Sequence, residues 1–286
     1  MTPEIAALLS AMGWAGDSIL VRKGARTSNI VAAAFFSYCV AVFGFGAYLV
    51  ANPPPRDLWP RAAVYFVMGG CLQPLLARIL FYMGMTRMGV SRAGPLRGAE
   101  PLFALALAVI FLRERPNFLV YAGTAVIVTS AWLITSRGSG ESRWKLSHIA
   151  FPLGAAFFAA VSQNLRKAGL SIWPDPVFGA AVSTSTSLLL FVVFLAASGR
   201  IRLIRTNRRS FPFFGSAALV SMTAQFLNFA ALNRGEVSAM VPLTNTTPLF
   251  SVLFSLFFLR DQEEVSAKVI LGAALMVAGV VIIASR

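Results

Sequence analysis

The sequence predicts an all-α membrane protein with ten transmembrane helices, arranged as two inverted repeats of five helices each. Three observations lead to this prediction. The chain of 286 residues is 57% hydrophobic and 13% charged, about half the charged fraction of a typical soluble domain. Apolar runs of about 20 residues, the length that spans a bilayer as a helix, follow one another along the chain. The second half of the sequence also repeats the first.

The apolar runs define ten predicted spans. None alternates in the way that a membrane β-strand does, so helices are favoured. The first five spans are residues 4–21, 31–51, 61–83, 90–112 and 118–136, and the second five are residues 147–165, 177–198, 211–232, 237–259 and 266–284. No connection is long enough for a soluble module. We expect a single membrane domain whose two repeats are residues 1–140 and 141–286.

The internal repeat is clearest between residues 77–114 and residues 224–261. These stretches align without a gap at an offset of 147 positions, as the identical pair Arg87 and Arg234 illustrates (234 − 87 = 147). Each unit holds five spans, an odd number, so the second unit must enter the membrane from the opposite side. The pseudo-two-fold axis that relates the repeats then lies in the membrane plane.

Prolines interrupt the same span in each repeat. A proline removes one backbone hydrogen bond of a helix and leaves a carbonyl group free. Interrupted helices at corresponding places in the two halves indicate where a transporter binds its substrate. The predicted helix breaks and hinges are therefore at Pro95, Pro101, Pro242 and Pro248. Gentle helix curvature without a ligand is the alternative interpretation.

Ionisable residues inside the first repeat are the main candidates for a site, because an isolated charge is costly at membrane depth. These residues are Asp17, Arg78, Arg97 and Glu100. The alternating direction of the spans places the first three in one half of the bilayer, with Glu100 one turn deeper than Arg97. We predict that the four residues line a substrate cavity. The alternative is a structural cluster in which Asp17 pairs with Arg78, and Arg97 with Glu100.

The second repeat offers neutral polar groups in place of these charges, and Gln225 stands where the first repeat has Arg78. The predicted lining from this half is Ser221, Gln225, Asn228 and Asn245, and Trp14 and Tyr82 add aromatic surface from the first half. Such a cavity suits a substrate with one ionised end and one polar or aromatic end.

Short motifs recur at matching places in the two copies. The first copy reads Met88-Gly89-Val90-Ser91, Pro101-Leu102-Phe103 and Leu112-Arg113-Glu114, and the second reads Gly235-Glu236-Val237-Ser238, Pro248-Leu249-Phe250 and Leu259-Arg260-Asp261. These motifs resemble the EamA-type transporters of the drug/metabolite transporter superfamily, which include amino-acid exporters. The family signature ends in Leu-Gly-Glu, so this chain replaces the glycine in both copies.

The resemblance implies a secondary transporter that exports amino acids or similar small carboxylate metabolites by alternating access. Two alternatives stay open: a proton-coupled exporter of cationic drugs or other metabolites that uses Glu100 or Asp17, and a membrane scaffold or sensor that transports nothing. We do not expect an enzyme, because the sequence has no nucleophile–base pair and no phosphate-binding glycine loop. The expected partners are a small-molecule substrate and the lipid bilayer, with no cofactor, metal or nucleic acid, and the monomer as functional unit.

The net charge of +14 arises chiefly in short loops, among them the five arginines between residues 199 and 210. We attribute this charge to membrane topology and to attraction by anionic headgroups. The resemblance implies the bacterial inner membrane, with both termini in the cytoplasm. This orientation places the five arginines outside, against the positive-inside rule, and the charge count alone favours the reverse.

Overall fold

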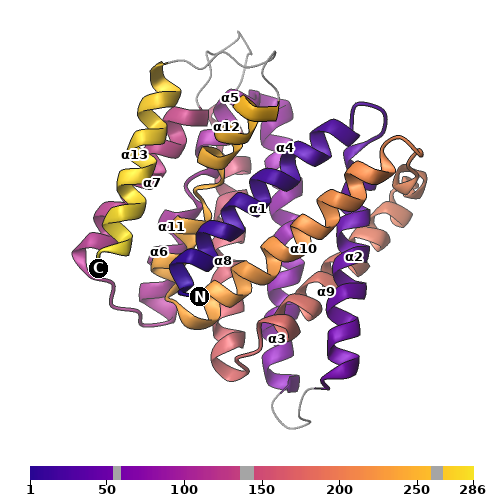
Figure 1. The fold of residues 1–286 in the computed structure, drawn as a ribbon, viewed down its shortest axis with the longest axis horizontal. Coiled ribbons are helices and arrows are strands. Elements are labelled where there is room, and N and C mark those ends of the chain that lie inside the picture. Colours follow the sequence, from indigo (N-terminus) through magenta and orange to yellow (C-terminus); the bar gives the residue numbers. More distant parts are fainter. Residues whose placement is uncertain (54–58, 136–144, 259–266) are drawn as a thin grey trace.

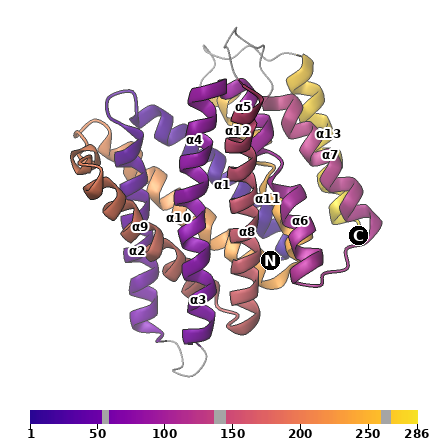
Figure 2. The same ribbon diagram turned by 180° about the vertical axis from the view of Figure 1, so that it is seen from behind.

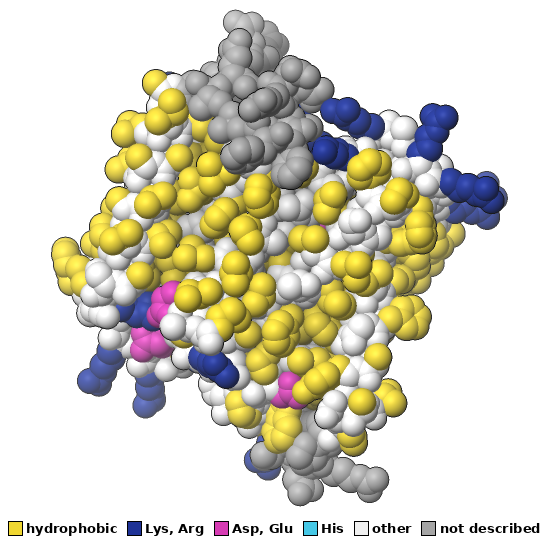
Figure 3. Space-filling view, viewed as in Figure 1, with side chains coloured by type: hydrophobic (Ala, Val, Ile, Leu, Met, Phe, Trp, Pro, Cys, Tyr) yellow, Lys and Arg dark blue, Asp and Glu magenta, His cyan; other side chains and the backbone are white. Residues whose placement is uncertain are grey.

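The computed structural model describes residues 1–53, 59–135, 145–258 and 267–286. In these ranges the chain forms a bundle of helices, which Figures 1 and 2 show from two opposite sides. Among the described residues, ten helical stretches are long and apolar enough to cross a membrane. Figure 3 shows a face covered largely by hydrophobic side chains, with Lys and Arg gathered toward its edges. The predicted all-α class with ten spans is confirmed.

The spans keep the predicted order, although several consist of more than one helix. The first repeat contains α1 (Pro3–Gly24), α2 (Ile30–Ala51), α3 (Trp59–Gly70), the π-helical η1 (Cys71–Leu76), α4 (Ala77–Met88), α5 (Val90–Arg97), α6 (Glu100–Phe111) and α7 (Phe118–Thr135). The second contains η2 (Leu146–Ile149), α8 (Ala150–Ile172), α9 (Pro176–Ala197), η3 (Ile201–Ile204), α10 (Phe211–Arg234), α11 (Val237–Thr244), α12 (Thr247–Phe258) and α13 (Ala267–Ala284). An ion pair of 3.1 Å between Glu4 and Arg286 joins the two ends of the chain.

Small residues allow helices of opposite repeats to pack closely. A Cβ atom on Gly13 of α1 would lie 2.8 Å from the Cβ atom of Ala224 on α10, and the Ser10 hydroxyl donates to the Ala224 carbonyl at 2.8 Å. In the same way, a Cβ atom on Gly123 of α7 would lie 3.0 Å from the Gly279 carbonyl oxygen of α13. Close backbone approach at small residues is a common basis of helix association in membranes.

Spans four and nine are both broken next to the predicted prolines. In span four, α5 ends at Arg97 and α6 begins at Glu100. In span nine, α11 ends at Thr244 and α12 begins at Thr247. In each repeat, one proline lies in the last turn of the helix before the break, and a second lies in the first turn of the helix after it. That these breaks act as hinges stays a prediction.

Span three contains a break that the sequence analysis did not predict. Gln73, with φ −133° and ψ 130°, is extended within η1, as expected for a residue that precedes a proline. Three serines donate to carbonyl groups of this region: Ser162 to Gly69 at 2.9 Å, Ser183 to Phe66 at 3.0 Å and Ser187 to Gly70 at 3.0 Å. The hydroxyl groups of α8 and α9 therefore satisfy backbone acceptors around the break.

The sixth span extends beyond its predicted end at residue 165. The helix α8 continues to Ile172, where the backbone leaves the helical region at Trp173. Arg166, one residue beyond the predicted end of this span, lies well inside the helix and is 3% exposed. The correction matters because it adds a buried cation to the bundle.

The turn after α6 explains one departure from the family signature. Arg113 has φ 56°, a left-handed conformation that favours glycine, and it stands where the Leu-Gly-Glu signature of the resemblance described above has glycine. The Glu114 N–H that follows donates to the Ala108 carbonyl at 3.2 Å. The turn therefore has a left-handed backbone at a residue that carries a Cβ atom.

Replacing Arg113 by glycine is therefore expected to stabilise the protein by up to about 1 kcal/mol, because the left-handed conformation is unfavourable for residues with a Cβ atom. The measurement is the midpoint of thermal unfolding in detergent. Arg115→Gly is the matched control, because within the described residues Arg113 is the single non-glycine residue with positive φ. A midpoint that falls equally in both variants contradicts the strain at Arg113.

Candidate functional site

A cavity of about 740 Å³ lies between the two repeats. The first repeat contributes residues of α1, α2, η1, α4 and α6, and the second contributes residues of α8 to α12. Gln73 at the η1 break, Glu100 at the start of α6 and Asn245 between α11 and α12 all belong to the wall. The cavity is therefore bordered by all three helix breaks, the arrangement expected for a substrate site in a transporter built from inverted repeats.

Most of the predicted site residues lie together in the wall of this cavity. They are Trp14, Asp17, Arg78, Tyr82 and Glu100 from the first repeat and Ser221, Gln225, Asn228 and Asn245 from the second. Arg97 does not line the cavity. The chemical asymmetry between a charged and a neutral wall is present in the structure, and the substrate contacts themselves stay predictions.

Arg97 is engaged by Glu100. An Nη1 to Oε2 distance of 2.6 Å joins the two side chains across the α5–α6 break, and Glu100 is 4% exposed. The second carboxylate oxygen of Glu100 has no hydrogen-bond partner. The structural alternative considered from the sequence thus holds for this pair, and it removes Arg97 from the groups that face the cavity.

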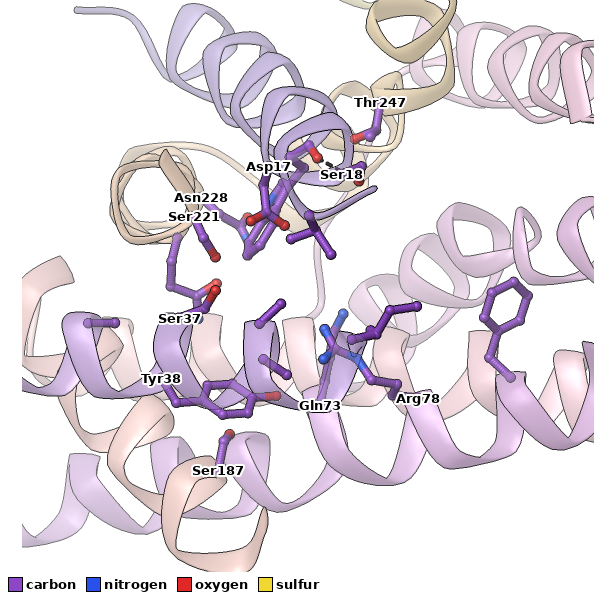
Figure 4. Close-up of a pocket in the computed structure, with 18 of the residues that line it drawn as sticks. Asp17, Ser18, Ser37, Tyr38, Gln73, Arg78, Ser187, Ser221, Asn228 and Thr247 are labelled. Atoms are coloured by element: carbon purple, nitrogen blue, oxygen red, sulfur yellow. Dashed lines mark hydrogen bonds between the residues drawn. The ribbon is translucent and has the colours of Figure 1, made fainter. Parts of the chain in front are cut away.

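Arg78 and Asp17 do not form the other ion pair that the structural alternative predicts. No ion pair or side-chain hydrogen bond joins Arg78 to any residue within the described parts of the chain. Its side chain is exposed to the cavity although it lies deep in the bundle. Figure 4 shows Asp17 and Arg78 projecting from opposite sides of the cavity, with Tyr38 on the same side as Arg78. Asp17 Oδ1 is buried and without a hydrogen-bond partner.

Several lining residues escaped the sequence analysis. The wall of the cavity also includes Tyr38, Gln73, Gln163, Arg166 and Thr184. Hydropathy gave no reason to single out hydroxyl and amide groups among the many polar residues of the spans. Arg166 was missed because its place beside Lys167 made it look like the basic end of a span.

Arg166 is held by neutral groups. Its Nη1 donates to Gln163 Oε1 and its Nη2 to the Gln73 carbonyl, each at 3.4 Å. The guanidinium carbon also lies 5.1 Å from the centre of the Phe229 ring, and Nε has no hydrogen-bond partner. Both hydrogen bonds are long. Among the described residues, no acid lies within ion-pair distance of this buried cation.

The lining of the cavity extends to one end of the bundle. It includes Arg22 and Arg26 at the turn between α1 and α2, at the end opposite the termini. At the end nearer the termini, the side chains of Val237, Met240 and Leu243 on α11 are fully buried. The cavity therefore reaches the end that carries the α1–α2 turn and is closed toward the other.

Charged side chains tie the closed end together. Both carboxylate oxygens of Glu114 accept backbone N–H groups at the start of α11, from Val237 at 2.8 Å and Ser238 at 3.0 Å. Lys167 donates to the carbonyl groups of Leu232 at 2.8 Å and Gly235 at 2.9 Å at the end of α10. A carboxylate at a helix N-terminus and an ammonium group at a C-terminus both complement the helix dipole. Glu114 in this way connects the first repeat to the second.

Replacing Glu114 by alanine is expected to open the closed end more often, because two charge-assisted hydrogen bonds between the repeats are lost. Maleimide labelling of a cysteine at Met240 measures the opening, with Cys39 and Cys71 replaced by alanine. The loss of bonds of this kind predicts labelling at least about tenfold faster. Glu236→Ala removes a neighbouring exposed acid and is the control. Equal labelling rates in the two variants would show that Glu114 does not hold the closed end shut.

Two stretches of the chain, residues 1–136 and 146–285, each match the EamA-like transporter family. The chain belongs to this family. Membership makes the protein a membrane transporter rather than an enzyme, and the double match agrees with the two repeats of the structure. The predicted boundary at residues 140 and 141 falls between the two matched stretches and, in the structure, outside the described residues.

Relatives and a solved structure agree with the family. A transporter from Archaeoglobus fulgidus, named only "Uncharacterized transporter", is 21% identical over 285 residues, which are 99% of this chain and 98% of the relative. A protein from Streptantibioticus cattleyicolor, named "Probable terminal-alkyne amino-acid exporter", is 26% identical over 186 residues, 60% of this chain and 61% of the relative. A crystal structure of 13% identity matches with a TM-score of 0.76 over 98% of this chain and 95% of its own, which shows the fold alone.

Proposed function

We propose that the protein exports amino acids or similar small carboxylate metabolites by alternating access. The observation that carries this proposal is Arg78, a guanidinium group that is open to the central cavity and has no ion-pair partner among the described residues. A guanidinium group binds a carboxylate through two parallel charge-assisted hydrogen bonds. An intramembrane cation exposed to a cavity is a functional residue by default, because a charge at membrane depth is costly to keep.

The opposite side of the cavity suits the amino group. Asp17 faces Arg78 across the cavity and has a buried oxygen without a donor. A zwitterionic amino acid would place its carboxylate at Arg78 and its ammonium group toward Asp17. The side chain of the amino acid would then face Gln225 and Asn228, which line the cavity from the second repeat. The name of the Streptantibioticus relative, which matches 60% of this chain, supports amino-acid export.

The matched helix breaks support alternating access. Spans four and nine are broken at matching places beside the cavity, and charged side chains such as Glu114 and Lys167 hold the closed end. Breaks at corresponding places let one repeat rock against the other around a fixed site. Residues of one chain supply both walls of the cavity, and we propose the monomer as the functional unit.

Proton-coupled export of cationic drugs is the second candidate function. The unpartnered oxygen of Asp17 and the second oxygen of Glu100 favour it, because an acid in the cavity can attract a cation. Arg78 and Arg166 in the same wall oppose it. The two candidates differ in charge preference. Thermal stabilisation of the purified protein by a panel of amino acids and quaternary ammonium compounds tests this preference. Stabilisation by the quaternary compounds alone contradicts the carboxylate proposal.

We place the protein in the bacterial inner membrane with both termini in the cytoplasm, which puts the five arginines between residues 199 and 210 outside. In intact cells, an impermeant maleimide is then expected to label a cysteine at Ser198 and not one at Pro54. Permeabilised cells, in which both positions react, provide the control. Labelling of position 54 alone in intact cells reverses the orientation, as the positive-inside rule favours.

A further inference from the structure

The cavity contains a second guanidinium group that a single substrate carboxylate leaves unused. Arg166 is 3% exposed and lines the cavity from α8, in the second repeat. A buried charge is costly unless it is paired. Its described contacts are two neutral acceptors at 3.4 Å and the face of Phe229, and Nε has no partner. The protein therefore keeps a cation at the cavity wall with much of its donor capacity unfilled.

The nearby acids do not neutralise this cation by contact. Glu100 attracts Arg166 over a distance, but its carboxylate is bound at 2.6 Å by Arg97, which lies outside the cavity lining. Asp17 faces Arg78 on the other side of the cavity. With Glu100 engaged by Arg97, the described residues of the inner part of the cavity include two guanidinium groups, Arg78 and Arg166, and one remaining acid, Asp17.

The two guanidinium groups flank one feature of the backbone. Arg166 donates to the Gln73 carbonyl in the η1 break, and Arg78 follows that break in the first turn of α4. Gln73 Oε1 is buried and has no hydrogen-bond partner. The break therefore gathers two anion-binding groups, from different repeats, around an acceptor that is free to receive an N–H donor.

We propose that the substrate carries two acidic groups, as an acidic amino acid does, and that Arg78 binds one carboxylate while Arg166 binds the other. The inference rests on the proposed function and names the substrate class of the same cavity. A carboxylate replaces the long contact between Arg166 and Gln163 with charge-assisted hydrogen bonds, which are shorter and stronger. The ammonium group is received by Asp17 and Gln73.

Near-isosteric substrate pairs isolate the second carboxylate. The probes are L-glutamate against L-glutamine and L-aspartate against L-asparagine, because each pair differs at the side-chain terminus alone. The measurement is equilibrium binding of the radiolabelled amino acids to the purified full-length protein, which depends on neither transport direction nor coupling ion. We expect the acid of at least one pair to bind at least about tenfold more tightly than its amide.

Three variants assign the preference to residues. Arg166→Met is expected to lower acid binding to the level of the amide while amide binding changes by less than about threefold. Arg78→Met is expected to weaken both members of a pair, because both carry the α-carboxylate. Arg87→Met is the matched control, since Arg87 lies on α4, stacks on Phe151 and does not line the cavity. A merely structural role of Arg166 lowers acid and amide binding together and overturns the proposal.

The ratio of acid to amide affinity in the wild-type protein tests the inference even if Arg166→Met does not fold. Arg166→Lys keeps the buried charge and provides a second variant for comparison. Acid and amide bound with equal affinity in both pairs overturn the inference and leave the proposed function intact. Binding of neither pair also overturns the inference, and the proposed function falls with it if no other amino acid or carboxylate binds.

Discussion

Arg78→Ala is expected to lower the transport of carboxylate substrates by about a hundredfold while the amount of folded protein stays close to that of the wild type. The estimate corresponds to the loss of two charge-assisted hydrogen bonds, together worth about 3 kcal/mol. Folding is expected to tolerate the change, because the Arg78 guanidinium makes no ion pair or hydrogen bond with the described residues. The measurement is uptake into vesicles, normalised to monodisperse protein.

Lysine at position 78 is expected to rescue transport in part, because it keeps the charge but loses the planar fork that holds a carboxylate. Arg87→Ala on the same helix, outside the cavity lining, is the control for removing an arginine from α4. Full transport by Arg78→Ala removes this residue from the substrate site. Loss of folded protein in Arg78→Ala assigns it a structural role instead.

Arg97→Ala is expected to act on stability, with a loss of about 3–5 kcal/mol, because it leaves the buried Glu100 carboxylate without its partner. The double variant Arg97→Ala/Glu100→Gln is expected to recover much of this loss, since an amide is far cheaper to bury than an unpaired charge. Thermal unfolding of the two single variants and the double variant gives the coupling between the residues. Additive effects of the two substitutions contradict the ion pair as the role of Arg97.

These two predictions divide residues that the sequence treats alike. Arg78 and Arg97 both lie inside predicted spans, and the alternation of spans places them at similar depth. The spacing of three residues already offered the pairing of Arg97 with Glu100 as an alternative. The structure selects this pairing, because α5 ends at Arg97, α6 begins at Glu100 and the two side chains lie 2.6 Å apart across the break.

The fold could be predicted from the sequence because hydropathy and the internal repeat are each read over about 20 residues or more, so single residues affect them little. Ten apolar stretches appear where ten were predicted, and the broken spans four and nine appear beside the matched prolines. The break in span three was missed because the second repeat does not share it: the offset of 147 places Ser221 opposite Pro74, and α10 is continuous there. Symmetry is informative only about features that both copies have kept.

The lining of the cavity could be predicted in part, since most of the residues that the sequence indicated do line it. Arg166 was missed for a physical reason. A charged residue at the end of a hydropathy run indicates a span boundary, but here α8 continues to Ile172 and buries the charge against Phe229. The chemistry of the second repeat is therefore less neutral than its sequence indicates, and this difference led to the proposed class of substrate.

Efflux from preloaded proteoliposomes tests the central claim most directly. Vesicles that contain the purified protein are loaded with radiolabelled amino acids, dicarboxylates or a quaternary ammonium compound, and the loss of label is followed against vesicles without protein. The account predicts protein-dependent efflux of amino acids or small carboxylates that the Arg78→Ala variant largely loses. Efflux of the quaternary ammonium compound alone, or equal efflux by wild type and Arg78→Ala, contradicts it.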